Sequence, residues 1–407
     1  MLRRHLAKAL VTFVAGAPTI EANALWGDQL SPFVSEVVTS DDNVFRLPEG
    51  VDPQAAIGAP SAGDTYHATS AGFAFNVAAD ANRFEGEVAL NRYRFGEFDE
   101  LDFDGYGARA VWRWRAAERF TGDLGHDRSK ALASLSNVQS GTQRTTPNVI
   151  DTQRTYVSAT YQATPRWQFR ADARTASQRN DALVYRPSDI DTRTTELTIA
   201  YVTERMTRIG LIADNTDGDL PNRQLLGTRS IDNSYKQRRL DAFIEWPTSA
   251  HSQFKLRTGS ADRNYVQIPE RDFNGSLYVA SLDWQPSDNL TLTATSQRDI
   301  SPYEEVNVGF VLSRGFGFAT RWKVRDKALL ALDFDRANRT YLGEPASVLN
   351  RSDPYAERIR GTGARLSLQP RKQMTIDVGW RHERRTPLNT LSSYSASIAS
   401  VGLKFAF

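Results

Sequence analysis

The chain has 407 residues, 24% of them charged, and a mean hydropathy of −0.48. No stretch approaches the roughly 18 uninterrupted apolar residues that a membrane-spanning helix needs, which excludes a helical membrane protein. Cysteine is absent, which excludes disulfides, zinc–thiolate sites and a cysteine-linked lipid anchor, and fits export to an oxidising compartment.

The first two dozen residues have the composition of a signal peptide. Three basic residues precede a short apolar run over residues 9–15, and the small residues of Ala22-Asn23-Ala24 suit a signal peptidase. We therefore predict a signal peptide over residues 1–24 and a single mature domain over 25–407; the alternative is an amphipathic N-terminus. The segment carries the whole formal charge of +2, so the mature chain is neutral and no nucleic-acid partner is expected. Its charged residues are Arg3, Arg4, Lys8 and Glu21.

From about residue 30 onward, apolar and polar residues alternate with a period of two. In the last segment Val401, Leu403, Phe405 and Phe407 share one face, and Lys404 lies on the other. Residues 290–295 and 374–381 alternate in the same way. Such alternation indicates strands with two unlike faces.

Short and long connections alternate between these strands. This arrangement is typical of an outer-membrane barrel with short periplasmic turns and long extracellular loops. The sequence therefore predicts an all-β fold, a transmembrane antiparallel barrel of about 18 strands (16–18), with both ends periplasmic. A weak first strand at 31–39 and an overlong one at 306–322 leave the number open by two, and a soluble propeller or sandwich is the alternative fold. The short connections are expected at 78–82, 116–118, 164–166, 204–206, 247–251, 286–289, 325–327 and 370–373, and the long ones include 41–64, 131–150, 214–233 and 342–354.

Five of the eight tryptophans lie within about three residues of a predicted short turn. Indole rings favour the membrane interface, so these residues predict an aromatic girdle at the periplasmic rim. They are Trp114, Trp167, Trp246, Trp284 and Trp322. The terminal Phe405 and Phe407 are expected to form part of the signal read by the barrel insertion machinery.

Extending the parity of the last strand to the others predicts a charged lumen. A lysine or arginine facing lipid at the bilayer midplane costs about 2–4 kcal/mol, so charges in the strands must face inward. They either pair across a plugged lumen or line a water channel, and a barrel of 16–18 strands favours the channel. The predicted lumen-lining residues are Arg109, Arg113, Arg170, Asp172, Arg174, Lys255, Arg257, Asp333, Asp335, Asp377, Arg381, Glu383 and Lys404.

No catalytic constellation is recognisable in the sequence. The histidines at 67, 126, 251 and 382 have no metal-ligand spacing, and no nucleophile motif occurs. The pairs Asp41-Asp42 and Glu304-Glu305 suggest either Ca²⁺ ligands or, more commonly, solvated loop carboxylates. We therefore expect no enzyme activity, no metal and no cofactor. An outer-membrane enzyme using His126 or His382 is the least favoured alternative.

Two further sequence features stand out. One is Asp42-Asn43-Val44-Phe45-Arg46-Leu47, which follows a first strand beginning Leu30-Ser31-Pro32-Phe33, and the other is the tryptophan-turn hairpin, as in Leu282-Asp283-Trp284-Gln285-Pro286-Ser287-Asp288. Together they resemble the EpsL-type outer-membrane proteins encoded with exopolysaccharide synthesis operons. The resemblance implies a non-catalytic conduit in the outer membrane of a Gram-negative bacterium. It would pass an exopolysaccharide received from a periplasmic polysaccharide export protein. A general diffusion porin for small solutes is the alternative, and an adhesive or structural barrel with a blocked lumen is a further one.

Overall fold

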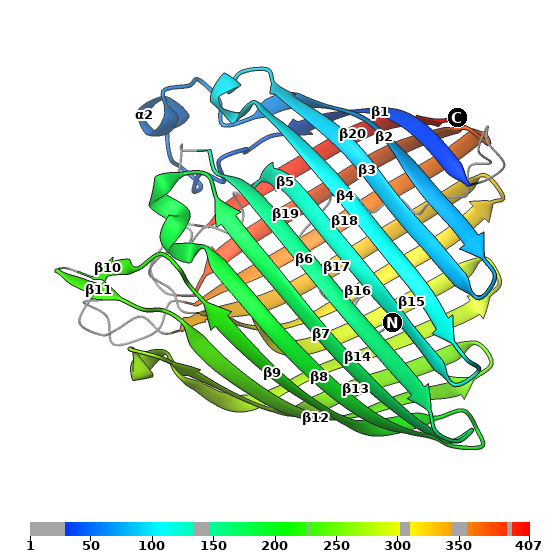
Figure 1. Ribbon diagram of the computed structural model, residues 1–407. Helices are drawn as coiled ribbons and strands as arrows, with labels where there is room; N and C mark the ends of the chain where they lie inside the picture. Colours follow the sequence, from blue (N-terminus) through cyan, green and yellow to red (C-terminus); the bar gives the residue numbers. More distant parts are fainter. Residues whose placement is uncertain (1–28, 134–146, 227, 302–309, 343–355, 389–392) are drawn as a thin grey trace.

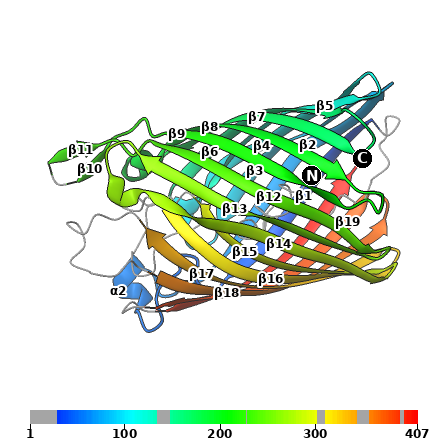
Figure 2. The same cartoon turned by 90° about the horizontal axis from the view of Figure 1, so that it is seen from below.

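The computed structural model describes residues 29–133, 147–226, 228–301, 310–342, 356–388 and 393–407. They form a closed antiparallel barrel of 18 strands, which confirms the predicted fold. Each barrel strand pairs with its neighbours along the chain, and β1 pairs with both β2 and β20, which closes the sheet. Figure 1 shows the strands running obliquely around the barrel, and Figure 2 shows the wall from below.

The barrel strands are 12 to 16 residues long, enough to cross the apolar core of a bilayer when tilted. A separate hairpin, β10 (Gln224–Leu226) and β11 (Arg229–Ile231), stands in the loop between β9 and β12. The barrel strands are β1 (Leu30–Asp41), β2 (Asp64–Ala79), β3 (Asn82–Phe95), β4 (Phe103–Ala116), β5 (Phe120–Leu132), β6 (Val149–Gln162), β7 (Trp167–Asn180), β8 (Ile190–Val202), β9 (Arg208–Asp219), β12 (Tyr235–Ser249), β13 (Ser252–Tyr265), β14 (Phe273–Ser287), β15 (Leu290–Ser301), β16 (Phe310–Arg325), β17 (Ala328–Leu342), β18 (Ala356–Arg371), β19 (Met374–Pro387) and β20 (Tyr394–Ala406).

The connections alternate in length as the sequence predicts. All eight short turns are present, with between two and five residues separating the strands that they join. The first residues of β1 and the end of β20 lie at this same rim, where the Phe407 amide donates to the Pro32 carbonyl at 2.9 Å. The short-turn rim is therefore the periplasmic one, and the longer connections lie at the extracellular rim.

Among the described residues of the extracellular connections, the helices are short: α2 (Pro53–Ile57), η1 (Asp99–Leu101), η3 (Leu183–Ser188) and η4 (Pro269–Arg271). In the part of the chain that the structure describes, no helix is long and apolar enough to cross a membrane.

Three strand limits differ from the prediction. The first strand is longer than expected, β16 ends at Arg325 and not at residue 322, and β9 continues through residues 214–219, which the sequence predicts as a loop. The sequence predicts a loop for the polar residues at the end of β9 because they lack alternating apolar side chains. Above the membrane both faces of the wall meet water, so a strand there needs no apolar side chains. The predicted signal peptide and residues 302–309, with the pair Glu304-Glu305, lie outside the described residues, as do parts of three predicted long loops.

Candidate functional site

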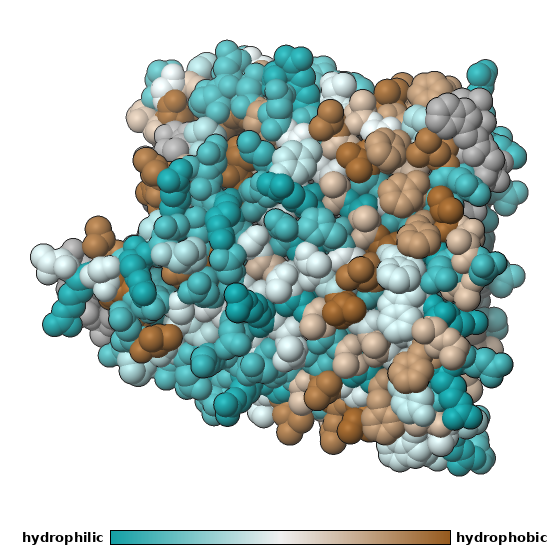
Figure 3. All heavy atoms as spheres, viewed as in Figure 1, coloured by the Kyte–Doolittle hydropathy of each residue, from teal (hydrophilic) through white to brown (hydrophobic). Residues whose placement is uncertain are grey.

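The two faces of the barrel wall differ because side chains alternate along every strand. The large hydrophobic side chains that the barrel strands expose all share one parity, as in Phe73, Leu197, Phe318 and Trp380, and this face meets lipid. Figure 3 shows hydrophobic side chains gathered on the short-turn half of the wall, and hydrophilic ones on the extracellular half. Side chains of the opposite parity face the lumen.

All thirteen residues predicted to line the lumen have this inward parity in the structure. Their neighbours explain how so many charges share one surface, since most of them pair with a charge on the same strand or on a strand one or two places away. Whether they contact a passing solute stays a prediction. The pairs fall into three groups around the wall.

The most enclosed group surrounds Arg257 on β13. Its guanidinium pairs with Asp241, with Asp214 at 3.1 Å and with Glu196 at 3.5 Å. Arg239 shares Asp241 at 2.7 Å and also contacts Asp299 at 3.2 Å. The Asp241 side chain is fully buried and that of Arg257 is 10% exposed, so these charges are held within the wall lining rather than in open water.

A second group is centred on Arg381 of β19. Its two terminal nitrogens contact Asp333 at 2.9 Å and Asp335 at 2.7 Å, so one arginine bridges two carboxylates of β17. Toward the extracellular end, Arg385 contacts Glu357 at 3.2 Å, and both side chains are fully buried. The Tyr394 hydroxyl donates to Glu383 at 2.7 Å.

The third group lies on β3 to β7 and is more open. Arg113 contacts Glu85 at 3.0 Å, and Arg109 lies 3.5 Å from Asp127 with its side chain 44% exposed. Arg170 pairs with Asp172 at 2.6 Å. Elsewhere on the inward face, the Lys255 ammonium lies 3.4 Å from the Asp283 carboxylate. Asp377 accepts a hydrogen bond from the Ser367 hydroxyl. The Lys404 ammonium lies over the Phe33 ring, 4.0 Å from its centroid. The lining therefore alternates in sign along its length.

Aromatic side chains gather near the extracellular mouth of the barrel. Tyr235, Tyr265 and Phe273 project inward from β12, β13 and β14, and Phe310 packs against them from the start of β16. Arg263 lies over the Tyr235 ring at 4.2 Å. We call these five residues the mouth cluster.

The segment Asp42–Leu47, which carries the family resemblance, folds over the same mouth. Val44, Phe45 and Leu47 are buried against Phe98 and Leu101 of the β3–β4 connection. Asn43 holds the turn in place, since its side-chain amide donates hydrogen bonds to the backbone carbonyls of Leu47 and Ser395, each at 3.0 Å. Burial works against the charge of Arg46, but Asp41, Tyr394 and Glu383 nearby raise its pKa above the ordinary value.

This geometry bears on the pair Asp41-Asp42, for which the sequence predicts solvated loop carboxylates, with Ca²⁺ ligands as the alternative. The Asp41 carboxylate binds Arg46 at 2.8 Å, and Asp42 accepts the Ser397 amide at 2.7 Å. Both carboxylates are thus committed to protein partners that hold the segment in place.

The sequence and fold comparisons agree on the class of protein. A family model described as "Putative beta-barrel porin 2" matches residues 255–407, and no curated protein sequence matches the chain. The structure resembles three Pseudomonas aeruginosa proteins at a TM-score of 0.50: OccK2 (OpdF), OccK9 (OpdG) and OpdK crystallised with vanillate. The alignments cover 93% of this chain and 98%, 98% and 99% of those chains, at 10%, 10% and 9% identity, a likeness of fold. The chain is a porin-like barrel of the Gram-negative outer membrane.

Within the described ranges, the tryptophans of this porin-like barrel have the parity of the lipid-facing side. Trp167, Trp246, Trp284 and Trp322 are exposed next to periplasmic turns, and Trp114 is partly covered because its ring lies over Gly122 of β5. Phe405 and Phe407 are exposed at the same rim and contact each other edge to face. Their roles as girdle and insertion signal stay predictions. Sequence reasoning did not include Trp112, which has the parity of Trp114 and is exposed beside it.

The two histidines considered as catalytic bases lie on the outer wall of the porin-like barrel. His126 shares the parity of the lipid-facing Leu124 and contacts the Thr155 hydroxyl at 2.9 Å. His382 follows Trp380 on the same face and contacts the Ser397 hydroxyl at 3.0 Å. Neither residue faces the lumen.

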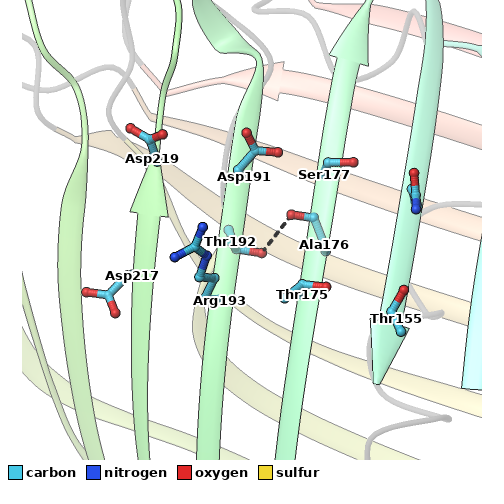
Figure 4. A pocket seen from close by; sticks show the side chains of 10 residues that line it. Thr155, Thr175, Ala176, Ser177, Asp191, Thr192, Arg193, Asp217 and Asp219 are labelled. Atoms are coloured by element: carbon cyan, nitrogen blue, oxygen red, sulfur yellow. Dashed lines mark hydrogen bonds between the residues drawn. The ribbon is translucent and has the colours of Figure 1, made fainter. Parts of the chain in front are cut away.

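A hollow of about 490 Å³ also opens on the outer wall, between β6 and β9 (Figure 4). Its side chains are mostly of outward parity and polar, because this part of the wall lies beyond the apolar band. They include Gln153, Thr155, Thr175, Asp191, Arg193, Asp217 and Asp219. The hollow is separate from the lumen.

Sequence reasoning missed most acidic partners of the predicted lumen arginines. Glu85, Glu196, Asp214 and Asp241 share the inward parity of their strands, and extending the parity reading to β3, β8, β9 and β12 would have found them. Their pairing with particular arginines depends on strand register and barrel curvature, which a single sequence does not specify.

Proposed function

We propose that this porin-like barrel is a passive channel for small polar solutes. The observation that carries the proposal is an 18-strand barrel whose inward face holds paired charges of both signs. Barrels of about 16–18 strands leave an aqueous passage, because side chains do not fill so wide a lumen. Because each charge of the lining has a partner of opposite sign, the passage stays polar but lacks the strong electrostatic field of a pore lined by charges of one sign.

The extracellular mouth favours small solutes over a polymer. The mouth cluster brings aromatic side chains into the lumen from one side, and Asp42–Leu47 packs at the same end of the barrel. Both are buried and hydrogen-bonded parts of the fold, so a bulky polymer would have to displace them. A small solute needs only the space that they leave.

A liposome-swelling assay with the mature chain tests this proposal. Proteoliposomes are diluted into isotonic solutions of sugars of increasing mass, and swelling is followed by light scattering. We expect swelling rates that fall steadily from pentose to trisaccharide. Rates no faster than those of protein-free liposomes would contradict the proposal.

Export of an exopolysaccharide is the second candidate, and the ordered Asp42–Leu47 segment supports it. The residues behind the EpsL resemblance form a defined structure at the extracellular mouth, where an emerging polymer would be met. A gene deletion separates the candidates. Polymer trapped in the periplasm of the deletion strain supports export with a periplasmic partner, and normal surface polysaccharide with impaired solute uptake supports the small-solute channel.

A further inference from the structure

The lipid-facing apolar band ends abruptly on β15 to β19. On β16 the outward side chains Trp322, Phe318 and Phe316 give way to Arg314, and on β17 Phe334 gives way to Arg336. Because the band occupies the periplasmic half of these strands, the arginines lie where it meets the extracellular headgroup layer.

Six outward arginines lie close together at this level of β15 to β19: Arg298, Arg314, Arg336, Arg358, Arg360 and Arg384. Antiparallel register places Arg298 opposite Arg314, and Arg336 opposite Arg360, which in turn lies opposite Arg384. Like charges directly opposite on adjacent strands repel each other. We define the arginine patch as Arg298, Arg314, Arg336, Arg358 and Arg360.

The arginine patch has no acidic counterpart among the described residues. Arg298 donates to the Ser276 hydroxyl at 3.1 Å, and Arg358 donates to the Asn338 side-chain oxygen at 3.3 Å. Neither contact neutralises a charge. The neighbouring Arg384 is different, since it lies 3.4 Å from Glu49.

On the opposite wall of the barrel, several outward arginines have acidic partners. At a comparable height Arg94 contacts Asp104 at 3.0 Å, Arg128 contacts Asp151 at 2.8 Å, and Arg179 contacts Asp191 at 2.6 Å. These three outward arginines of β3, β5 and β7 each have a carboxylate partner, and those of the arginine patch do not.

We propose that the arginine patch binds phosphate groups of anionic lipids in the outer leaflet. Guanidinium groups form bidentate hydrogen bonds with phosphate, and several converging arginines suit one phosphorylated headgroup. The position on the lipid-facing wall, directly above Phe316 and Phe334, places acyl chains against the apolar band and headgroups against the arginines. The bound phosphates relieve the cross-strand repulsion, and the site is independent of what passes through the lumen.

Native mass spectrometry of the mature barrel tests the proposal. The detergent-solubilised protein is titrated with dioleoyl phosphatidic acid, with dioleoyl phosphatidylcholine as the neutral-headgroup probe. The patch variant is Arg314→Gln/Arg336→Gln/Arg360→Gln. The matched control is Arg94→Gln/Arg128→Gln/Arg179→Gln, which removes three outward arginines that already have acidic partners.

We expect wild type and the control variant to retain phosphatidic acid more strongly than phosphatidylcholine. The patch variant should bind phosphatidic acid at least about tenfold more weakly, since each basic side chain near a membrane surface contributes about a fivefold factor. Arg→Lys changes at the same three positions keep the charge but lose the bidentate geometry, so they should restore only part of the binding. Heat-modified mobility on gels verifies folding of each variant.

Equal loss of phosphatidic acid in the patch and control variants would overturn the proposal, as would unchanged binding in the patch variant. A patch variant that alters only the oligomeric state would also overturn it, in favour of a protein interface. Competition by inorganic phosphate as effective as that by the lipid would indicate a site for the free anion and not for a membrane lipid.

Discussion

Removing Arg257 should destabilise the barrel more than removing any half-exposed lumen arginine. Three carboxylates converge on its guanidinium, and the side chain of one of them, Asp241, is fully buried. In an Arg257→Met variant these carboxylates lose the positive charge that they share, but they remain buried. Breaking a buried ion pair by removing one partner costs about 3–5 kcal/mol. Arg239 still contacts Asp241 at 2.7 Å, so we expect the lower part of this range.

Guanidinium-induced unfolding in lipid vesicles, followed by tryptophan fluorescence, measures this cost. Arg109→Gln is the matched control, because Arg109 also faces the lumen but is 44% exposed and lies 3.5 Å from its partner Asp127. Exposed pairs contribute about 0.2–1 kcal/mol, so the control should change the free energy of unfolding little. Adding Asp241→Asn to Arg257→Met should recover part of the loss. Equal effects of Arg257→Met and Arg109→Gln would refute the reasoning.

Three further predictions concern the pore and the wall. Arg113→Glu places a second carboxylate beside Glu85 on the open part of the lining. The reversal potential measured in a salt gradient should therefore shift toward cation selectivity. An unchanged reversal potential would mean that this part of the wall is not on the ion path. Phe273→Ala removes a ring from the mouth cluster, and swelling rates for disaccharides should rise relative to pentoses, whereas an unchanged size dependence would separate the cluster from the entrance. Gly122→Val should cost about 1–3 kcal/mol of unfolding free energy and shift the tryptophan emission, because a Cβ there would lie 2.3 Å from the Trp114 ring; wild-type stability would contradict this packing.

The sequence predicts the fold well because lipid imposes a simple rule on the wall. Side chains in phase with Phe407 must be apolar where they cross the bilayer, so alternation alone identifies the strands and their faces. The same rule gives the inward parity of Arg257 and Arg381 without knowledge of the structure. It fails in β9, where the strand rises above the membrane and polar side chains occupy both faces.

Contacts between distant segments were beyond the sequence. Nothing in the pattern associates Arg257 with Glu196, which is 61 residues earlier, because that contact depends on how the wall curves. The arginine patch was recognisable in principle, since Arg314 and Arg336 are in phase with the lipid-facing Phe316 and Phe334. The assumption that charged strand residues face inward concealed it, and that assumption holds only within the apolar band.

Single-channel recording tests the central claim most directly. The mature chain is inserted into planar bilayers bathed in concentrated potassium chloride, with no periplasmic partner present. A passive small-solute channel predicts steady conductance that scales with salt concentration and falls when neutral sugars enter the pore. A barrel that inserts, shown by its heat-modified mobility, yet carries no current above that of the bare bilayer would contradict the account.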